Sequence, residues 1–139
     1  MYCGQCGEYI PERNKFCTKC GAPVSPNFEG EQKDEYYLVK TGVDEVGYRN
    51  HQQLINLLRR VKHDRILVDL AGVKFIDSVG IGSLVTVTYS GARKGQEIKL
   101  VIDNKDVMKS IRSLGVDNIL EIYGTPEEAK GSWGLTAHH

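Results

Sequence analysis

Residues 65–89 read RILVDLAGVKFIDSVGIGSLVTVTY, and this stretch decides the fold class of the 139-residue chain. Its first part, RILVDL at residues 65–70, is a short and almost continuous apolar run, typical of a β-strand buried on both faces. Its last part, LVTVTY at residues 84–89, is rich in β-branched residues, so propensity alone predicts another strand there. The spacing of the apolar residues contradicts that propensity.

The second half of the stretch carries an apolar stripe at helical spacing, formed by Ile81, Leu84, Val85, Thr88 and Ala92. A further apolar run, IKLVI at residues 98–102, again has the character of a buried strand. If it pairs in parallel with residues 65–70, the connection must include a crossover of about a dozen residues or more. A strand at residues 84–89 would leave no room for that crossover. We therefore predict a strand, a loop and then a helix.

The flanking residues continue this alternation of strands and helices. Strand patterns occur at YYLVKT, residues 36–41, and at ILEIY, residues 119–123. Helix patterns with candidate N-caps follow Asn50, Asn104 and Thr125, and Gly115 is positioned to end the second of these helices. Such alternation predicts an α/β fold, with a mostly parallel β-sheet covered by helices.

All four cysteines lie in a separate N-terminal part, in the order Cys3, Cys6, Cys17 and Cys20. Two Cys-x-x-Cys pairs can together supply the four thiolates of a tetrahedral, structural Zn²⁺ site with no open position for catalysis. Gly7 and Gly21 follow the two pairs and can adopt the positive φ that such a turn requires. Disulfides or a redox role are the alternatives, and we favour one structural zinc ion because no export signal is evident. The run also resembles small bacterial zinc ribbons.

These patterns divide the chain into four parts. We expect a zinc ribbon at residues 1–24, a linker at residues 25–35, the α/β domain at residues 36–131 and a C-terminal tail at residues 132–139. The linker is predicted from the stretch APVSPNFEGEQKDE at residues 22–35, which has two prolines, a glycine and a run of charges but few apolar residues.

Composition limits the classes of function. The formal net charge is zero, so the basic excess that accompanies direct nucleic-acid binding is missing. The basic run RRVKHDR at residues 59–65 is better explained as a solvated helix end. Apolar runs fall short of the roughly 18 residues that a membrane span needs, and we expect a cytoplasmic protein.

The pair Asp77-Ser78 falls at the start of the predicted helix. One of the two side chains would cap the first turn, while Gly80 and Gly82 would let that turn approach its neighbour closely. Nucleophilic catalysis by Ser78 is disfavoured, because the G-x-S-x-G elbow is missing and no sequence feature brings a histidine near it. We therefore expect a protein that is not an enzyme.

From about residue 36 to residue 129 the chain resembles the STAS domain, and within that family the bacterial anti-sigma-factor antagonists. The most specific element is VDLAGVKFIDSVGIGSL, in which Asp69, Asp77, Ser78, Gly80 and Gly82 match the family's pattern. The resemblance implies that Ser78 is a phosphoacceptor for a partner anti-sigma factor that is also a serine kinase. By the same resemblance, Asp77, Gly80, Gly82 and Asp69 shape the site.

The resemblance further implies a transcription regulator that binds its kinase while Ser78 is unmodified and releases it when Ser78 is phosphorylated. ATP and Mg²⁺ would belong to the kinase. The alternative is a constitutive STAS-type scaffold or assembly subunit without a phosphoswitch. Two departures from the family pattern stand out: the linker and ribbon occupy the place of a short strand ahead of residue 36, and Val79 replaces a second Ser or Thr.

Overall fold

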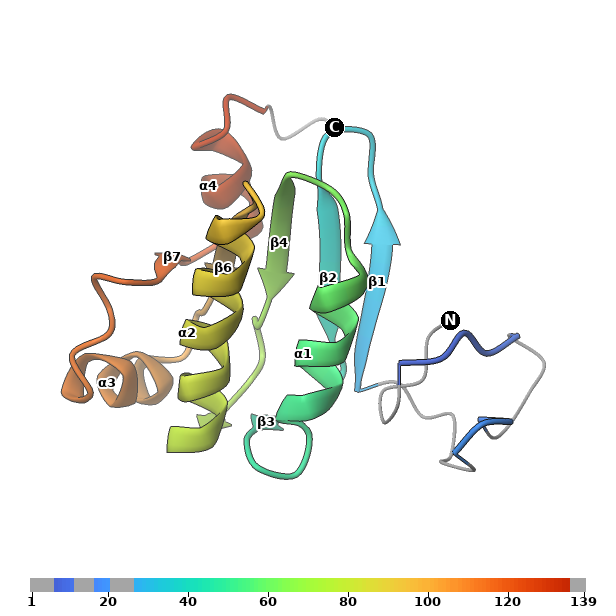
Figure 1. Cartoon of the computed structure of the whole chain (residues 1–139). Coiled ribbons are helices and arrows are strands. Elements are labelled where there is room, and N and C mark those ends of the chain that lie inside the picture. The colour runs from blue at the N-terminus through green and yellow to red at the C-terminus, as the bar shows by residue number, and fades with distance from the viewer. Residues whose placement is uncertain (1–6, 12–16, 21–26, 136–139) are drawn as a thin grey trace.

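The computed structural model describes residues 7–11, 17–20 and 27–135. Within them, the elements in chain order are β1 (Phe28–Gln32), β2 (Tyr37–Thr41), β3 (Glu45–Val46), α1 (His51–Arg60), β4 (Arg65–Asp69), β5 (Phe75–Ile76), α2 (Ser78–Arg93), β6 (Glu97–Val101), α3 (Lys105–Ser113), β7 (Glu121–Tyr123) and α4 (Pro126–Gly131). The described part of the chain is thus an α/β fold, as predicted (Figure 1).

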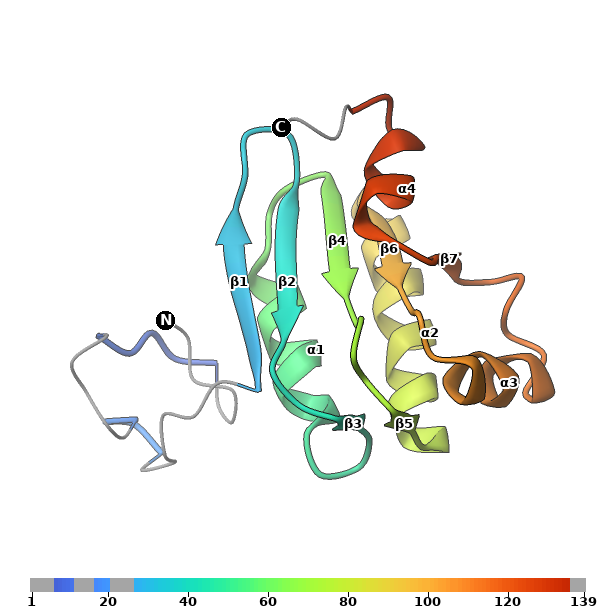
Figure 2. The same cartoon turned by 180° about the vertical axis from the view of Figure 1, so that it is seen from behind.

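The main sheet of the described residues has the strand order β1-β2-β4-β6-β7. Strands β2, β4, β6 and β7 run parallel, while β1 is antiparallel to β2. The short strands β3 and β5 pair in parallel as a separate two-stranded sheet, and Figure 2 shows them side by side near the ends of β2 and β4. This arrangement confirms the prediction of a mostly parallel sheet with helices.

Strand β1 corrects the expectation that linker and ribbon replace a strand ahead of residue 36. Phe28–Gln32 lie within the predicted linker, yet they pair along their whole length with Tyr37–Thr41. Their sequence, FEGEQ, hides the strand because only Phe28 is apolar and buried. Backbone hydrogen bonds to β2, which no side-chain pattern reports, hold this edge strand in place.

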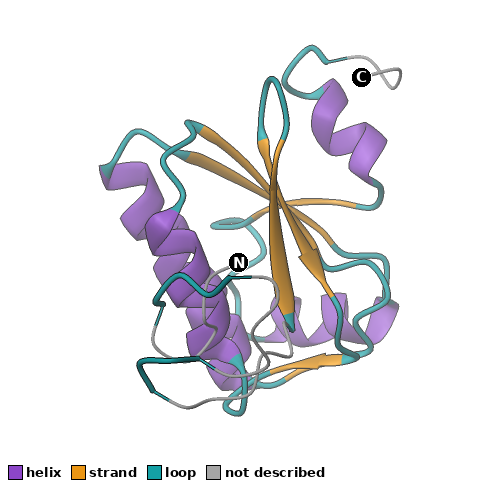
Figure 3. Cartoon of the chain, turned by 90° about the vertical axis from the view of Figure 1, so that its right-hand side faces the viewer, coloured by secondary structure: helices purple, strands orange, loops and turns teal. Residues whose placement is uncertain are grey.

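Helix α2 confirms that residues 84–89 are helical, as the spacing of the apolar residues predicted, although their β-propensity favoured a strand. Its buried face includes Ile81, Leu84 and Val87, which pack with α1 and the sheet in the main hydrophobic core. Figure 3 shows the sheet edge-on, with α1 and α2 on one side and α4 on the other. Burial of this apolar face overrides the β-propensity of the threonines and valines, because tertiary packing outweighs weak local preferences.

The predicted caps of the two later helices are also confirmed. Asn104 Oδ1 accepts hydrogen bonds from the backbone N–H groups of Asp106 and Val107, at 2.8 and 3.0 Å. Thr125 Oγ1 accepts one from Glu128 N at 3.1 Å. Gly115, just after α3, has a φ of +71°, the left-handed conformation that suits a glycine at a helix end.

A second core covers the opposite face of the sheet, where α4 and the following residues pack. At its edge, the Lys99 side chain on β6 is only 3% exposed, and its Nζ lies 3.1 Å from Glu121 Oε2 and 3.4 Å from Glu97 Oε2. It also donates to Tyr123 Oη at 3.3 Å and lies 4.9 Å from the centre of the Trp133 ring. Burial alone lowers the pKa of Lys99, but Tyr123 and the two carboxylates outweigh that effect, and its pKa is raised.

Candidate functional site

Ser78 is the first residue of α2 and is exposed to solvent. The preceding residues form β5, which holds Ile76 in the core, so the chain passes directly from a buried strand into the helix. The N-terminal end of a helix carries a partial positive charge, which favours an anion at this position. The structure therefore places an accessible hydroxyl where added negative charge is tolerated.

Asp77 is the N-cap of α2. Its Oδ1 accepts from Gly80 N at 2.8 Å, and its Oδ2 accepts from Tyr48 N, on the loop before α1, at 3.1 Å. Partial burial alone would raise the pKa of Asp77, but hydrogen bonds from the backbone of Gly80, Tyr48 and Val79 outweigh it and hold the pKa below its ordinary value. The capping role is confirmed for Asp77, whose carboxylate also joins α2 to the loop before α1.

Room for this carboxylate comes from Gly47. A Cβ built at Gly47 would overlap the Asp77 carboxyl group, so any side chain at this position would displace Asp77 or the loop. Nothing in the sequence singles out Gly47, because a glycine between a strand and a helix is expected as an ordinary turn residue. A partner 30 positions further along the chain leaves no local signal.

The two glycines of the motif have different environments. A Cβ at Gly80 would lie 2.5 Å from the backbone oxygen of Val46 and 2.8 Å from Ile76 Cγ2, so α2 meets β3 and β5 closely there. A Cβ at Gly82 would meet nothing within 4 Å. The expectation of a close approach is therefore confirmed for Gly80 and wrong for Gly82, whose position faces open space.

Asn50 occupies the N-cap position of α1, but its side chain makes no capping hydrogen bond. Instead, Asn50 Oδ1 accepts from Gly47 N at 3.0 Å, and its Nδ2 donates to Glu45 O at 2.9 Å. The side chain is buried and holds the loop that faces Asp77. The predicted cap residue thus acts on the loop rather than on the helix.

Asp69 ends β4, and its role is local. Its Oδ1 accepts from Ala71 N at 2.9 Å, which shapes the turn after the strand. The other end of that turn is held by Asp103, whose Oδ1 accepts from Gly72 N at 3.2 Å. These bonds position the segment that leads to β5. No contact of Asp69 with Ser78 is among the hydrogen bonds of the described residues.

A histidine does approach α2, which the sequence analysis did not foresee. His51, the first residue of α1, has its Nδ1 3.0 Å from Ser83 Oγ, and Ser83 Oγ donates to Val79 O at 2.9 Å. The charge of His51 also favours the ionised form of Asp77. The imidazole is thus engaged by Ser83, five positions after Ser78, and it ties the start of α1 to the first turns of α2.

Apolar side chains surround the start of α2 on the molecular surface. Tyr48, Phe75 and Val79 are 67%, 56% and 41% exposed, and each lies within three residues of Ser78 or on the loop bonded to Asp77. A hollow of about 260 Å³, lined in part by Tyr48, Phe75 and Asp77, lies between that loop and β5. We name the three exposed residues the apolar rim. Such a cluster beside a polar group is typical of a protein-binding surface.

The predicted zinc ligands lie partly within the described residues. Cys17 is buried and Cys20 is exposed, whereas Cys3 and Cys6 lie outside the described residues. Gly7 has a φ of +82°, as expected for a turn after the first cysteine pair. Residues 7–11, 17–20 and 27–135 contain no group of three potential metal ligands, as expected when Cys3 and Cys6 lie outside them. Gly7 therefore fits a ribbon, and the zinc ion stays a prediction.

Gly7 also lies against the end of α1. A Cβ at Gly7 would lie 2.9 Å from Arg60 Nε, so the backbone of residue 7 rests against the last residue of that helix.

Within the part of the chain that the structure describes, no helix has the length and apolar character needed to cross a membrane.

Comparison with known proteins identifies both parts of the chain. The model of the STAS domain family matches residues 32–129, and the model of the zinc-ribbon domain matches residues 2–24. Among solved structures, an anti-sigma factor antagonist from Mycobacterium paratuberculosis is similar with a TM-score of 0.64 and 20% identity, over 78% of this chain and 96% of that chain.

Two further structures share the fold. The anti-sigma factor antagonist SpoIIAA, in its unphosphorylated form, matches with a TM-score of 0.62 and 15% identity, over 78% of this chain and 98% of that one. The murine solute carrier 26 family member A9 anion transporter matches with a TM-score of 0.55 and 19% identity, over 63% of this chain and 15% of the transporter. The family model covers most of the chain, and the chain therefore belongs to the STAS domain family.

Proposed function

We propose that this protein is a phosphorylation-switched regulator of the anti-sigma-factor-antagonist type, and that Ser78 is its phosphoacceptor. Its partner is an anti-sigma factor that is also a serine kinase, bound while Ser78 is unmodified. The observation that carries the proposal is the exposed hydroxyl of Ser78 at the start of α2, directly after the carboxylate of Asp77 and beside the apolar rim. Similarity to two anti-sigma factor antagonists supports it.

Electrostatics explains how one phosphoryl group would act as a switch. Phosphorylation adds a charge of about −1.5 to −2 at neutral pH. Asp77 is held in its ionised form by backbone N–H groups, so the new charge would stand next to an existing one. A partner surface that covers the apolar rim and fits the neutral hydroxyl of Ser78 would, after phosphorylation, face two adjacent anions. Affinity falls tenfold for about every 1.4 kcal/mol of mismatch, so a few kcal/mol suffice for release.

The fold would survive this modification. The serine side chain is exposed, so a phosphoryl group meets water rather than the core. The start of α2 favours an anion by about 0.3–1 kcal/mol, which offsets part of the repulsion by Asp77. Switching would therefore act on the interface and leave the sheet and helices in place.

The other parts of the chain have supporting roles in this proposal. Residues 1–24 form a zinc ribbon in which Cys3, Cys6, Cys17 and Cys20 bind one structural Zn²⁺, consistent with the ribbon-family match. Residues 36–131 form the regulatory domain, extended by β1, and residues 132–139 form a tail. Chemistry at Ser78 is supplied by the kinase, so the chain itself acts as a binding protein.

A constitutive scaffold is the second candidate. The observation in its favour is the similarity to a domain-sized part of an anion transporter, in which the matching region is a small share of the whole. In that case the apolar rim would bind a partner permanently, and Ser78 would have no regulatory role.

Incubation with the kinase and ATP, followed by intact-mass measurement, separates the two candidates. We expect one added phosphoryl group on the wild type, none on Ser78→Ala, and one on Ser90→Ala, a control that removes another exposed hydroxyl of α2. Capture of the kinase should be lost with Ser78→Asp and kept with Ser78→Ala. Phosphorylation that persists in Ser78→Ala, or equal capture by Ser78→Asp, would refute the switch.

A further inference from the structure

His51, the first residue of α1, is one end of a chain of hydrogen bonds that leads to the cap of α2. Its Nδ1 lies 3.0 Å from Ser83 Oγ, and Ser83 Oγ donates to Val79 O at 2.9 Å. Val79 O belongs to the same peptide group as Gly80 N, which donates to Asp77 Oδ1 at 2.8 Å. Hydrogen bonds through one peptide group therefore join the imidazole to the carboxylate that caps the helix.

These bonds determine which nitrogen of His51 carries the proton. The Ser83 hydroxyl has a single proton, and it is used in the bond to Val79 O, because a carbonyl oxygen can only accept. Ser83 Oγ must then accept from His51, so the neutral imidazole carries its proton on Nδ1 and takes up a second one on Nε2. His63 is the opposite case, because its Nδ1 accepts from Arg65 N at 3.0 Å and its own proton lies on Nε2.

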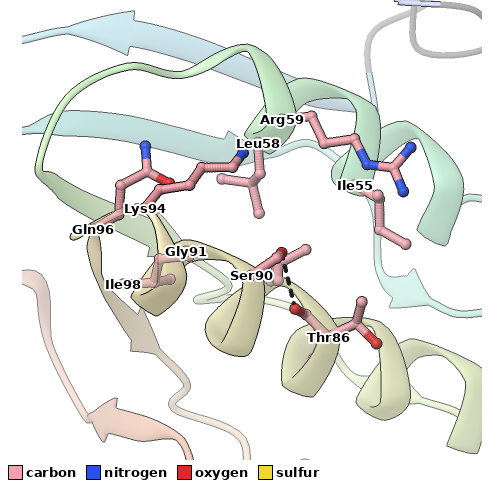
Figure 4. Close-up of a pocket in the computed structure, with 10 residues that line it drawn as sticks. Ile55, Leu58, Arg59, Thr86, Ser90, Gly91, Lys94, Gln96 and Ile98 are labelled. Carbon is pink, nitrogen blue, oxygen red and sulfur yellow. Dashed lines mark hydrogen bonds between the residues drawn. The ribbon is translucent and has the colours of Figure 1, made fainter.

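A serine bonded to the carbonyl oxygen four residues earlier is common in helices, so this bond alone indicates no function. In α2, Thr86 Oγ1 donates to Gly82 O at 2.9 Å and Ser90 Oγ donates to Thr86 O at 3.1 Å, and Figure 4 shows the second of these bonds. Thr86 and Ser90 are exposed, whereas Ser83 is only 5% exposed and its oxygen has the imidazole as a second partner. Burial and the bond to another helix thus distinguish Ser83 from the other hydroxyls of α2.

His51 and Asp77 are also close through the backbone. His51 N donates to Gly47 O at 2.8 Å, and a Cβ at Gly47 would overlap the Asp77 carboxyl group. Burial raises the pKa of Asp77, but backbone hydrogen bonds outweigh it, and the charge of His51 lowers that pKa further. From the side of β1, the first turns of α1 meet an uncharged group, since Asn27 Nδ2 donates to Gln53 Oε1 at 2.7 Å. The imidazole and the carboxylate therefore act on each other.

The other charged or titratable groups at this end of the two helices are Glu45 on β3 and Tyr48 and Arg49 on the loop, which line the hollow with Asp77. The rest of α2 up to its last turn carries no charged side chain. Glu45 acts on His51 in the same direction as Asp77, and Arg49 in the opposite one. Arg49 is the competing cation for an anion at this site, but its guanidinium carbon lies over the Tyr48 ring, 5.9 Å from the ring centre.

We propose that His51 is a positioning residue of the switch, and that it takes up a proton on Nε2 when Ser78 is phosphorylated. This role rests on the proposed phosphorylation of Ser78. The N-terminal end of α1 by itself disfavours a cation, so the added anion is what favours the imidazolium. His51 is half-buried, and the proton comes from solvent.

The hydrogen-bonded chain couples the two events. A hydrogen bond from a cationic imidazole to Ser83 is stronger than one from a neutral imidazole, and hydrogen-bonded groups in series polarise one another. The imidazolium would offset part of the repulsion between phosphoserine and Asp77, and it would hold the first turns of α2 against α1 in the modified protein. A purely structural bond between His51 and Ser83 would not respond to charge at Ser78.

The test uses the full chain with phosphoserine incorporated at position 78 during synthesis, so that it does not depend on the kinase. Long-range ¹H–¹⁵N spectra of the imidazoles, recorded from about pH 5 to pH 8.5, report which nitrogen is protonated and where each histidine titrates. Phosphorus NMR follows the phosphoryl group. Ser83→Ala breaks the chain, and Ser90→Ala is the matched control, because it removes an exposed hydroxyl with the same type of helix bond.

We expect neutral His51 to carry its proton on Nδ1 and neutral His63 on Nε2. Phosphoserine should move the titration of His51 to higher pH by about half a pH unit or more and leave that of His63 in place. Ser83→Ala should reduce this movement, and Ser90→Ala should not. A neutral His51 protonated on Nε2, a titration that moves no more than that of His63, or an equal movement in Ser83→Ala would overturn the proposal.

The phosphoryl group gives the reciprocal measurement. Because the coupling acts in both directions, His51→Gln should raise the pH at which the phosphoryl group titrates, whereas Arg49→Gln should leave it in place. The reverse result would assign the counter-charge to Arg49 and overturn the proposal. Failure of the kinase to modify Ser78, with an intact response of His51 to the incorporated phosphoserine, would refute the switch and leave this coupling standing.

Discussion

Replacing the two glycines at the start of α2 by alanine, one at a time, should have opposite effects on stability. At Gly82 a Cβ meets nothing within 4 Å, so Gly82→Ala only removes the poor helix propensity of glycine. The expected gain is about 1 kcal/mol in the free energy of unfolding. At Gly80 a Cβ would lie 2.5 Å from Val46 O, a backbone atom that also accepts from Asp77 N at 3.2 Å.

That oxygen cannot move away cheaply. Val46 is completely buried and belongs to β3, and its carbonyl links β3 to the cap of α2. Relieving the clash means moving α2 or β3 and weakening the Asp77 bond. Overpacking of this kind costs about 1–3 kcal/mol, and the propensity gain is smaller in the first turn than in the helix interior. The two alanine variants should therefore differ by about 2–4 kcal/mol in unfolding free energy.

Urea unfolding, followed by the fluorescence of Trp133, measures this difference, because Trp133 is the only tryptophan of the chain. The same proteins can be tested as kinase substrates. Gly82→Ala should be phosphorylated as the wild type is, while Gly80→Ala should react more slowly because the start of α2 has moved. Equal stability of the two variants, or a stabilised Gly80→Ala, would refute the packing described for this turn.

Three further predictions concern single interactions. Asp77→Ala should lose about 0.5–2 kcal/mol of stability in urea unfolding through loss of the cap, and a smaller change would contradict it. The pKa values of Asp77 and Glu97 are lowered in the folded protein. The stability that these ionised groups contribute is therefore present above their unfolded pKa values, about 4, and is lost as the pH falls through the folded values. A urea midpoint that is flat from pH 6 to about pH 3 would contradict this. Glu97→Gln combined with Glu121→Gln leaves the Lys99 ammonium buried without its carboxylates and should lower the free energy of unfolding by about 2 kcal/mol or more. The loss is smaller than for a fully buried ion pair because both glutamates are half exposed. Lys99→Met, which removes the buried charge itself, should cost less.

Removal of zinc should act on the N-terminal part alone. Metal analysis should find one zinc ion per chain, released by a chelator together with loss of protection of Cys17 and Cys20 against thiol reagents. The Trp133 signal should stay unchanged, since Trp133 packs against Lys99 and Tyr36 in the second core. A protein without zinc and with four reactive thiols would contradict the ribbon.

The sequence by itself determined the elements whose apolar residues follow a regular period. The runs at residues 65–70 and 98–102 and the helical stripe that includes Ile81 and Leu84 placed two neighbouring strands and the crossover helix correctly. The caps by Asn104 and Thr125 were also predicted correctly, and Asp77 was one of two candidates for the cap of α2, because these bonds span only two or three residues; the predicted cap Asn50 makes no such bond. A bond between residues that are close in sequence can be recognised from the few residues around it.

Only the tertiary structure decided what pairs over long separations in the chain. Strand β1 has almost no apolar pattern in its sequence, and it is held by backbone hydrogen bonds to β2 instead. The space that Gly47 leaves for Asp77, and the contact of His51 with Ser83, join residues about 30 positions apart. The difference between Gly80 and Gly82 depends on which side of the helix meets β3. These features arise from close packing between elements, and close packing is a property of the folded chain that residue spacing does not encode.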